Sequence, residues 1–505
     1  MKKNIIANVF GRLWGLLSAF LFIPLYIKFL GFESYSVISF TLLLAGILAV
    51  LDAGLTASLT REFAREDKNS KQKFLAYQTL EVLYLGIVAL ALCALILFAA
   101  QIAGMLNVKS FSIPQLAYFI KIVSIDIGFQ LLLRFYMGGL LGLEKQVLAN
   151  MLQVGWGIFR NAVAVLIIWQ KPSLEYFFIW QAFSTVLFTI LYKFQLDRRV
   201  APTGNFNLSI RFSKDIFQDL RNFAGGILLI SVVATINTQM DKLFISKLLS
   251  IENLGYYTLA ISLSTMLMVV VNPVATAVLP RFTSLYTSRS TEGPRHLFAK
   301  AGVVISVLVF SFLSVIIFFP KEILWVWTGN LSLADHAADV VPIVAAGYAA
   351  IALQVLPYHV ALANGFTKLN NIIGICSLLV TFPGYIFGIK YFGMMGAASV
   401  FLFVQGVTLV VYLFFINKKF IGEEFFKNLF VRQLLLPLCI GIVCCGIFKM
   451  IPFSFFSVRI FSLVWIALIG MFTFILISLF LLSKDQIKTI ADLPKRYING
   501  KKTSA

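Results

Sequence analysis

Apolar residues dominate this chain in long runs that are separated by short polar segments. A helix needs about 20 apolar residues to cross a hydrocarbon core of about 30 Å. The pattern predicts an all-α integral membrane protein with about fourteen transmembrane helices, or twelve or thirteen if neighbouring runs merge. The predicted spans are 7–30, 36–60, 76–102, 116–138, 147–169, 175–194, 222–247, 256–280, 300–320, 340–364, 370–390, 396–416, 431–450 and 459–482.

The composition agrees with this pattern. Of the 505 residues, 60% are hydrophobic and 13% are charged, and the mean hydropathy is +0.90. Because soluble domains carry about 25% charged residues, a soluble enzyme is excluded. A single-anchor protein is excluded as well, since the apolar runs cover the whole length. The first run continues past Pro24 to Leu30 without a small-residue cleavage site, which favours an uncleaved first span over a signal peptide.

The net charge of +20 comes from 42 Lys and Arg against 22 Asp and Glu. With both termini placed in the cytoplasm, cations on the inside outnumber those on the outside by about three to one, as the positive-inside rule requires. Membrane topology therefore explains most of the charge, and no nucleic-acid partner is implied. Five cations fall within predicted spans instead: Arg12, Lys121, Arg134, Arg160 and Lys242.

Several function classes are disfavoured by what the sequence lacks. The five cysteines show no metal-ligand spacing and no disulfide framework, and there is no GxxxxGK[ST] phosphate loop. An integral-membrane glycosyltransferase or polymerase needs a large outside loop and a carboxylate or metal motif, and neither is present. We therefore expect no enzyme activity, no metal and no cofactor.

One segment recurs within the chain. Lys28, Leu30 and Glu33 reappear as Lys247, Leu249 and Glu252, at one constant offset along the sequence. Each copy joins two long spans through a tight turn on the predicted outside. Six spans separate the copies, which predicts a parallel repeat about an axis along the membrane normal, a common design of secondary transporters.

Four groups of segments follow one another along the chain: Pro24–Gly31 with Glu33–Tyr35, Leu51–Leu55, Asp241–Leu249 with Leu254–Tyr257, and Gly393–Ala398. In these segments and their order the chain resembles the polysaccharide-transporter branch of the multidrug/oligosaccharidyl-lipid/polysaccharide (MOP) exporter superfamily, which includes O-antigen and capsule-unit flippases. Ser36 departs from the family, which often has Gly after Tyr35.

The resemblance implies two six-helix bundles related by a pseudo-two-fold axis, with two extra C-terminal helices and alternating access. The corresponding domains are 1–200, 201–420 and 421–505, the last with a basic tail. It implies a polyprenyl-diphosphate-linked oligosaccharide as substrate, moved from the cytoplasmic to the outer leaflet. Membrane lipids, and the polymerase and chain-length proteins of the same pathway, are the implied partners.

Cations within the spans are the candidate ligands for the diphosphate, because Arg and Lys bind phosphate well and are costly in lipid. Arg160 lies deepest and is the first candidate, with pairing to an acid as the alternative. Arg12 lies near the cytoplasmic entrance. Arg134 and Lys121 lie towards opposite ends of the fourth span, and snorkelling explains each as well as substrate contact does. Lys242 is the fifth candidate.

Acids within the spans are candidates for coupling or for structural roles. Asp52 could bind H⁺ or Na⁺, or make an interhelical hydrogen bond. Asp126, four residues before Gln130, shares a polar helix face with Arg134. Asp241 could neutralise Lys242 or cap a turn. Glu81, near the end of the third span, is expected at the interface.

Two other transport functions stay open beside the oligosaccharide flippase. A peptidoglycan-precursor (lipid II) flippase has the same general design. A cation-coupled drug exporter of the superfamily usually has twelve spans and an acidic cavity, and the cationic interior counts against it.

Overall fold

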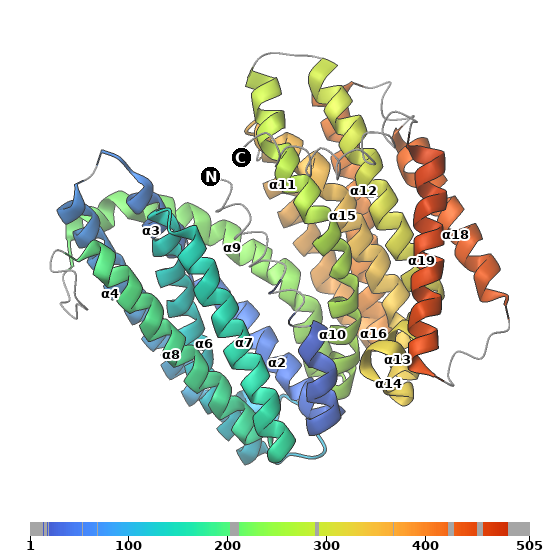
Figure 1. The fold of residues 1–505 in the computed structure, drawn as a ribbon. Coiled ribbons are helices and arrows are strands. Elements are labelled where there is room, and N and C mark those ends of the chain that lie inside the picture. Colours follow the sequence, from blue (N-terminus) through green and yellow to red (C-terminus); the bar gives the residue numbers. More distant parts are fainter. Residues whose placement is uncertain are drawn as a thin grey trace, which may run out of the picture. The chain divides into compact units, whose positions relative to one another are not determined.

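The computed structural model describes residues 14, 18, 20–52, 54–67, 69–201, 212–287, 292–366, 368–422, 429–451 and 458–482. Within this part of the chain every regular element is helical, as predicted. Eleven helices are long and apolar enough to cross a membrane. The protein is thus an all-α, multi-pass membrane protein (Figure 1).

The predicted count of fourteen spans is not confirmed. Only Phe20–Leu30 of the first predicted span is described as an apolar helix, and it is too short to be counted. The predicted span 222–247 lies in a helix that is not among the eleven, and the predicted spans 370–390 and 396–416 fall within one continuous range. Each of the other predicted spans overlaps one of the eleven candidate spans.

The residues divide into two compact units, each described here by itself. The first comprises residues 1–262 and 371–400, and the second comprises 263–370 and 401–505. The domain boundaries predicted near residues 200 and 420 stay a prediction. After the helix Phe20–Leu30, the elements that begin in the first unit are α2 Phe32–Leu48, η1 Ala49–Asp52, α3 Leu55–Ala64, α4 Ser70–Leu97, α5 Ala99–Gly104, α6 Ile113–Gly142, α7 Gln146–Gln170, α8 Leu174–Val200, α9 Lys214–Leu248 and α10 Ile251–Ser264.

The second unit is built around α12, which packs against four of its other helices, α11, α15, α18 and α19. The long helix α16, Lys368–Ile416, contributes to both units and is interrupted at Gly393 (φ 59°, ψ −143°). The remaining elements are α11 Met266–Thr287, α12 Glu292–Phe318, α13 Pro320–Thr328, α14 Leu331–Ala338, α15 Val340–Ala363, η2 Asn417–Ile421, η3 Phe430–Leu435, α18 Leu436–Lys449 and α19 Arg459–Leu481.

The close approach of two backbone segments explains why the segment that begins at Gly393 contains glycine. The chain turns back at Gly393, whose positive φ is costly for other residues. After the turn, Gly396 packs directly against Gly388, and a Cβ on Gly396 would collide with the Gly388 carbonyl group. This segment therefore requires glycine for steric reasons and carries no chemistry of its own.

The second predicted span is broken rather than continuous. Helix α2 tightens into the 3₁₀ turn η1, which ends at Asp52, and α3 starts after Gly54 in the left-handed conformation (φ 77°). In a membrane such a break is tolerated where protein or a cavity surrounds the backbone, and η1 packs against α4, α6 and α9. Discontinuous helices of this kind form substrate and ion sites in many transporters.

The two copies of the repeated segment form short connections between helices and touch each other within the first unit. Gly31 (φ 85°) links the helix Phe20–Leu30 to α2, and Leu249 and Ser250 link α9 to α10. The rings of Phe32 and Tyr256 stack with centroids 4.4 Å apart. Gly255 packs against the same ring, so closely that a Cβ would lie 2.9 Å from it.

Candidate functional site

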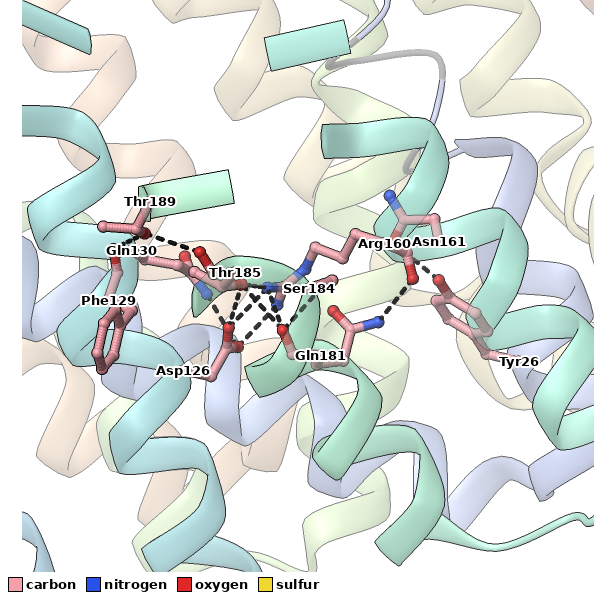
Figure 2. A network of polar contacts seen from close by, with 10 residues as sticks. All are labelled: Tyr26, Asp126, Phe129, Gln130, Arg160, Asn161, Gln181, Ser184, Thr185 and Thr189. Carbon is pink, nitrogen blue, oxygen red and sulfur yellow. Dashed lines mark hydrogen bonds and ion pairs between the residues drawn. The ribbon is translucent and has the colours of Figure 1, made fainter. Parts of the chain in front are cut away.

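Arg160 and Asp126 form a buried ion pair inside the first unit. Arg160 projects from α7 to α6, where Nη1 and Nη2 donate to Asp126 Oδ1 at 2.7 Å and Oδ2 at 2.8 Å (Figure 2). Their side chains are only 14% and 8% exposed. Charged groups within a span turn towards the bundle interior and pair there because lipid cannot solvate them.

Neighbouring polar groups complete the shell of this pair. Thr185 of α8 donates to Asp126 Oδ1 at 2.6 Å, and Gln130 donates to Oδ2 at 3.0 Å. Each carboxylate oxygen therefore accepts two hydrogen bonds, which satisfies a buried charge that would otherwise be strongly destabilising. The Arg160 guanidinium also lies 5.2 Å from the centroid of the Trp156 ring, within the range of a cation–π interaction.

The Arg160 guanidinium keeps part of its donor capacity. Nη1 is directed at Asp126, at the Thr185 hydroxyl and, more weakly, at the Gln181 carbonyl group 3.4 Å away. Nε and one hydrogen of Nη2 donate to no residue that the structure describes. Arg160 can thus hold Asp126 and still offer two N–H groups to an oxyanion, the bidentate mode in which guanidinium binds phosphate.

Beside the pair, Asn161 connects α7 to the first helix. Tyr26 donates its hydroxyl hydrogen to Asn161 Oδ1 at 2.9 Å (Figure 2), and its ring makes an edge contact with Phe177 of α8 at 5.0 Å. The helix Phe20–Leu30, α7 and α8 are therefore joined by polar and aromatic contacts around the Arg160 centre.

A second buried charge cluster lies between α4, α6 and α8. Lys193 donates to Glu81 Oε1 at 2.6 Å and is 3.3 Å from Asp197 Oδ2. Tyr136 donates to Glu81 at 2.7 Å and Tyr77 donates to Asp197 at 2.7 Å. Glu81, which the sequence places near the end of a span, is buried among these helices at 8% exposure.

The sequence contained a signal for this cluster. Lys193 and Asp197 are spaced i, i+4, which places them on one helix face. The predicted span stops at residue 194, whereas α8 continues to Val200. The longer helix brings both side chains into the bundle.

The other candidate residues lie apart from the Arg160 centre. Arg134 and Lys121 are exposed on α6, and neither makes an ion pair with a described residue. Lys242 donates to Gln239 Oε1 at 2.9 Å. Asp241 accepts from Tyr257 at 3.0 Å and from its neighbour's backbone N–H, so it does not neutralise the Lys242 ammonium directly. Arg12 lies outside the described residues.

Asp52 is held at the break in the second span. Its Oδ1 accepts from the Tyr84 hydroxyl at 3.0 Å, from the Thr56 hydroxyl, and from the Thr56 backbone N–H at 3.3 Å. The last contact satisfies a backbone N–H in the first turn of α3, whose N-cap residue is Gly54. Within the described parts of the chain, no group of three or more His, Cys, Asp or Glu side chains could hold a metal ion.

An entirely apolar groove of about 620 Å³ lies along α18 and α19 in the second unit. Its wall contains no charged side chain. The residues that line it include Cys439, Ile440, Val443, Ile447, Phe472 and Phe480. Because the two helices are highly hydrophobic and well exposed, the groove is open to the hydrocarbon region that they would cross.

The chain is similar to known proteins in sequence. The family model described as polysaccharide biosynthesis protein matches residues 1–286, and the MatE model matches residues 227–386. A putative O-antigen transporter from Shigella flexneri is 19% identical over 398 residues, which make up 78% of this chain and 93% of that protein.

Solved structures share the fold. The lipid II flippase MurJ, in an inward closed conformation, matches with a TM-score of 0.73 at 15% identity, over 95% of this chain and 98% of that chain. An inward-facing MATE family multidrug resistance transporter of the MOP superfamily matches with a TM-score of 0.65 at 12% identity, over 83% and 96%. Since the family model covers more than half of the chain, the protein belongs to the polysaccharide biosynthesis protein family and is a transporter of the MOP superfamily.

Proposed function

We propose that the protein is a flippase that moves a polyprenyl-diphosphate-linked oligosaccharide, of the O-antigen or capsule type, from the cytoplasmic to the outer leaflet of the bacterial inner membrane. The family match over residues 1–286 carries this proposal. The similarity to a putative O-antigen transporter along 93% of that protein supports the substrate class. Both termini are then cytoplasmic, as the distribution of cations predicts.

The apolar groove supports a substrate with a lipid tail. A flippase has to carry a polar head group through the protein while the tail stays among apolar groups. The groove on α18 and α19 offers such a surface, and its lining has no polar group that a tail would leave unsatisfied. In the fold comparison, the flippase covers 95% of the chain and the multidrug transporter covers 83%.

The diphosphate needs cations, and the first unit contains them at several depths. Arg160 is the proposed central ligand, since Asp126 fixes its orientation and two N–H groups stay available. Arg134 and Lys121 are proposed as contacts towards the two ends of α6, with Lys242 and Arg12 as further contacts. Together they would replace the hydration that the phosphates lose in the membrane.

The contacts between the two repeated segments are proposed to close one side during alternating access. Besides the Phe32–Tyr256 stack, Glu33 accepts the backbone N–H of Lys109 at 2.5 Å, and the Ile251 N–H donates to Asn107 at 3.1 Å. The loop 105–112 thereby binds both segments. In the predicted orientation these contacts lie on the outside, so opening to the outside would have to separate them.

A lipid II flippase is the second candidate, favoured by the match to the MurJ fold over nearly the whole chain. Both substrates carry a polyprenyl diphosphate, so the groove and the cations serve either. Supplying each lipid in turn to the purified protein in vesicles distinguishes them, because the head groups attached to the shared polyprenyl diphosphate differ.

A groove-filling variant tests the tail contact. We expect Val443→Trp to lower flipping of the lipid-linked oligosaccharide in vesicles by about tenfold. The bilayer is as apolar as the groove, so the loss comes from packing: roughly ten lost carbon contacts at about 0.1–0.2 kcal/mol each amount to 1–2 kcal/mol.

The matched control is Leu468→Trp, which adds the same side chain at an exposed site of α19 that does not line the groove. This variant should flip at the unmodified rate. Equal rates for both variants would show that the tail does not use the groove.

A further inference from the structure

The break in the second span places a carboxylate among hydroxyl groups that can reverse their hydrogen bonds. Asp52 ends η1, is half-buried, and is packed between α4, α6 and α9. Oδ1 accepts all three of its hydrogen bonds, from Tyr84 and from the hydroxyl and backbone N–H of Thr56. Oδ2 has no hydrogen-bond partner among the described residues.

The Tyr84 hydroxyl has two acceptors and one hydrogen. It lies 3.0 Å from Asp52 Oδ1 and 3.2 Å from the carbonyl oxygen of Leu131 in α6. A phenol hydroxyl donates one hydrogen at a time and accepts through its lone pairs. When the hydrogen points to Leu131, the oxygen of Tyr84 is free to accept a hydrogen from Asp52.

The network can therefore be satisfied in two protonation states without moving a heavy atom. In the ionised state, Tyr84 and Thr56 both donate to the carboxylate. In the protonated state, Asp52 donates its new hydrogen to the Tyr84 oxygen, while Tyr84 donates to Leu131. We propose that Asp52 is a proton-binding site of the transporter, built into the broken second span, and that Tyr84 is its hydrogen-bond switch.

Proton uptake would act on the helix that follows. The ionised carboxylate accepts a hydrogen bond from the Thr56 N–H and complements the positive end of the α3 dipole. A proton arriving from water adds to the Asp52 carboxylate and removes its negative charge. The hydrogen bond from the Thr56 N–H is then weaker, and the broken conformation of the second span is less stable. This inference rests on the proposed flippase function, to which it adds a driving ion for the transport cycle.

Other charged side chains lie on the helices that surround the Asp52 site. Arg134 of α6 acts electrostatically on the Tyr84 hydroxyl. The other described charged side chains on the helices around the break are these: Glu33 on α2; Arg61 and Glu62 on α3; Lys71, Lys73 and Glu81 on α4, the last one turn from Tyr84; Lys121 and Asp126 on α6; and Lys214, Asp241, Lys242 and Lys247 on α9.

Infrared difference spectroscopy of the purified full-length protein tests this assignment without requiring transport. Acidification should produce the carbonyl band of a protonated carboxylic acid, and Asp52→Asn should remove one component of it. Glu66→Gln, at an exposed site between α3 and α4, should leave that component unchanged.

Tyr84→Phe provides a second variant that keeps the carboxyl group. It removes the donor to the ionised form and the acceptor of the protonated form. Because the charge-assisted bond of the ionised form is the stronger of the two, the band should reach half its height at a pH higher by up to about one unit. A midpoint that does not move, or a band component that survives Asp52→Asn, would overturn the proposal.

A parallel measurement with sodium salts distinguishes proton binding from Na⁺ binding at Asp52. If Na⁺ rather than K⁺ raises the thermal stability of the unmodified protein and this effect is absent in Asp52→Asn, the site binds Na⁺ and the proton assignment is wrong. Because none of these readouts involves a lipid-linked sugar, they can succeed even if the proposed flippase function fails.

Discussion

Replacing Arg160 by glutamine is expected to destabilise the protein by about 3–5 kcal/mol, the usual cost of breaking a buried ion pair. The change leaves the Asp126 carboxylate with hydrogen bonds from Thr185 and Gln130 but without its cation. The loss should appear as a lower melting temperature and a smaller yield of monodisperse protein in detergent. Asp126→Asn should show a comparable loss, because it leaves the guanidinium unpaired.

The double variant Asp126→Asn/Arg160→Gln separates the structural role of the pair from binding. Neutral amides can hydrogen-bond to each other and to Thr185, so stability should recover substantially towards that of the unmodified protein. Transport should stay low, because the proposed diphosphate ligand is gone. A stable double variant that transports normally would restrict Arg160 to a structural role.

Replacing Lys193 by methionine is expected to have an effect of similar size, about 3–5 kcal/mol. Lys193 lies between Glu81 and Asp197, at 2.6 and 3.3 Å, and its removal leaves two carboxylates close together in an apolar core. Thermal unfolding monitored by fluorescence measures the loss.

Lys71→Met is the matched control, because it makes the same change at an exposed position at the start of α4. Adding Glu81→Gln to Lys193→Met should restore part of the stability, since it removes one of the two unpaired charges. If Lys193→Met melts at the temperature of the control, the cluster does not stabilise the bundle.

Helix content and the positions of most spans could be predicted because lipid imposes one requirement, an unbroken apolar helix long enough to cross it. Which charged residues pair with each other could not be predicted in this way. Arg160 and Asp126 were both identified as candidates, but only the packing of α6 against α7 and α8 decides that they meet. The Lys193 cluster was missed because α8 extends beyond its apolar run.

Backbone irregularities were also hidden from the sequence pattern. The run 36–60 predicts a continuous helix, whereas the left-handed Gly54 and the hydrogen bond from the Thr56 N–H to Asp52 break it. The runs 370–390 and 396–416 predict two helices, and the structure has both within the range of α16, but the pattern does not show that the chain turns at the single non-helical residue Gly393. In both cases hydrophobicity indicates that the chain is in the membrane but does not determine its local backbone conformation.

The central claim, export of a lipid-linked oligosaccharide, is tested most directly by locating that lipid after the protein is depleted from cells. A membrane-impermeant reagent that modifies the sugars reports which leaflet holds them. The account predicts that the glycan-loaded polyprenyl diphosphate accumulates on the cytoplasmic leaflet, protected from the reagent. Accumulation on the outer leaflet would contradict it.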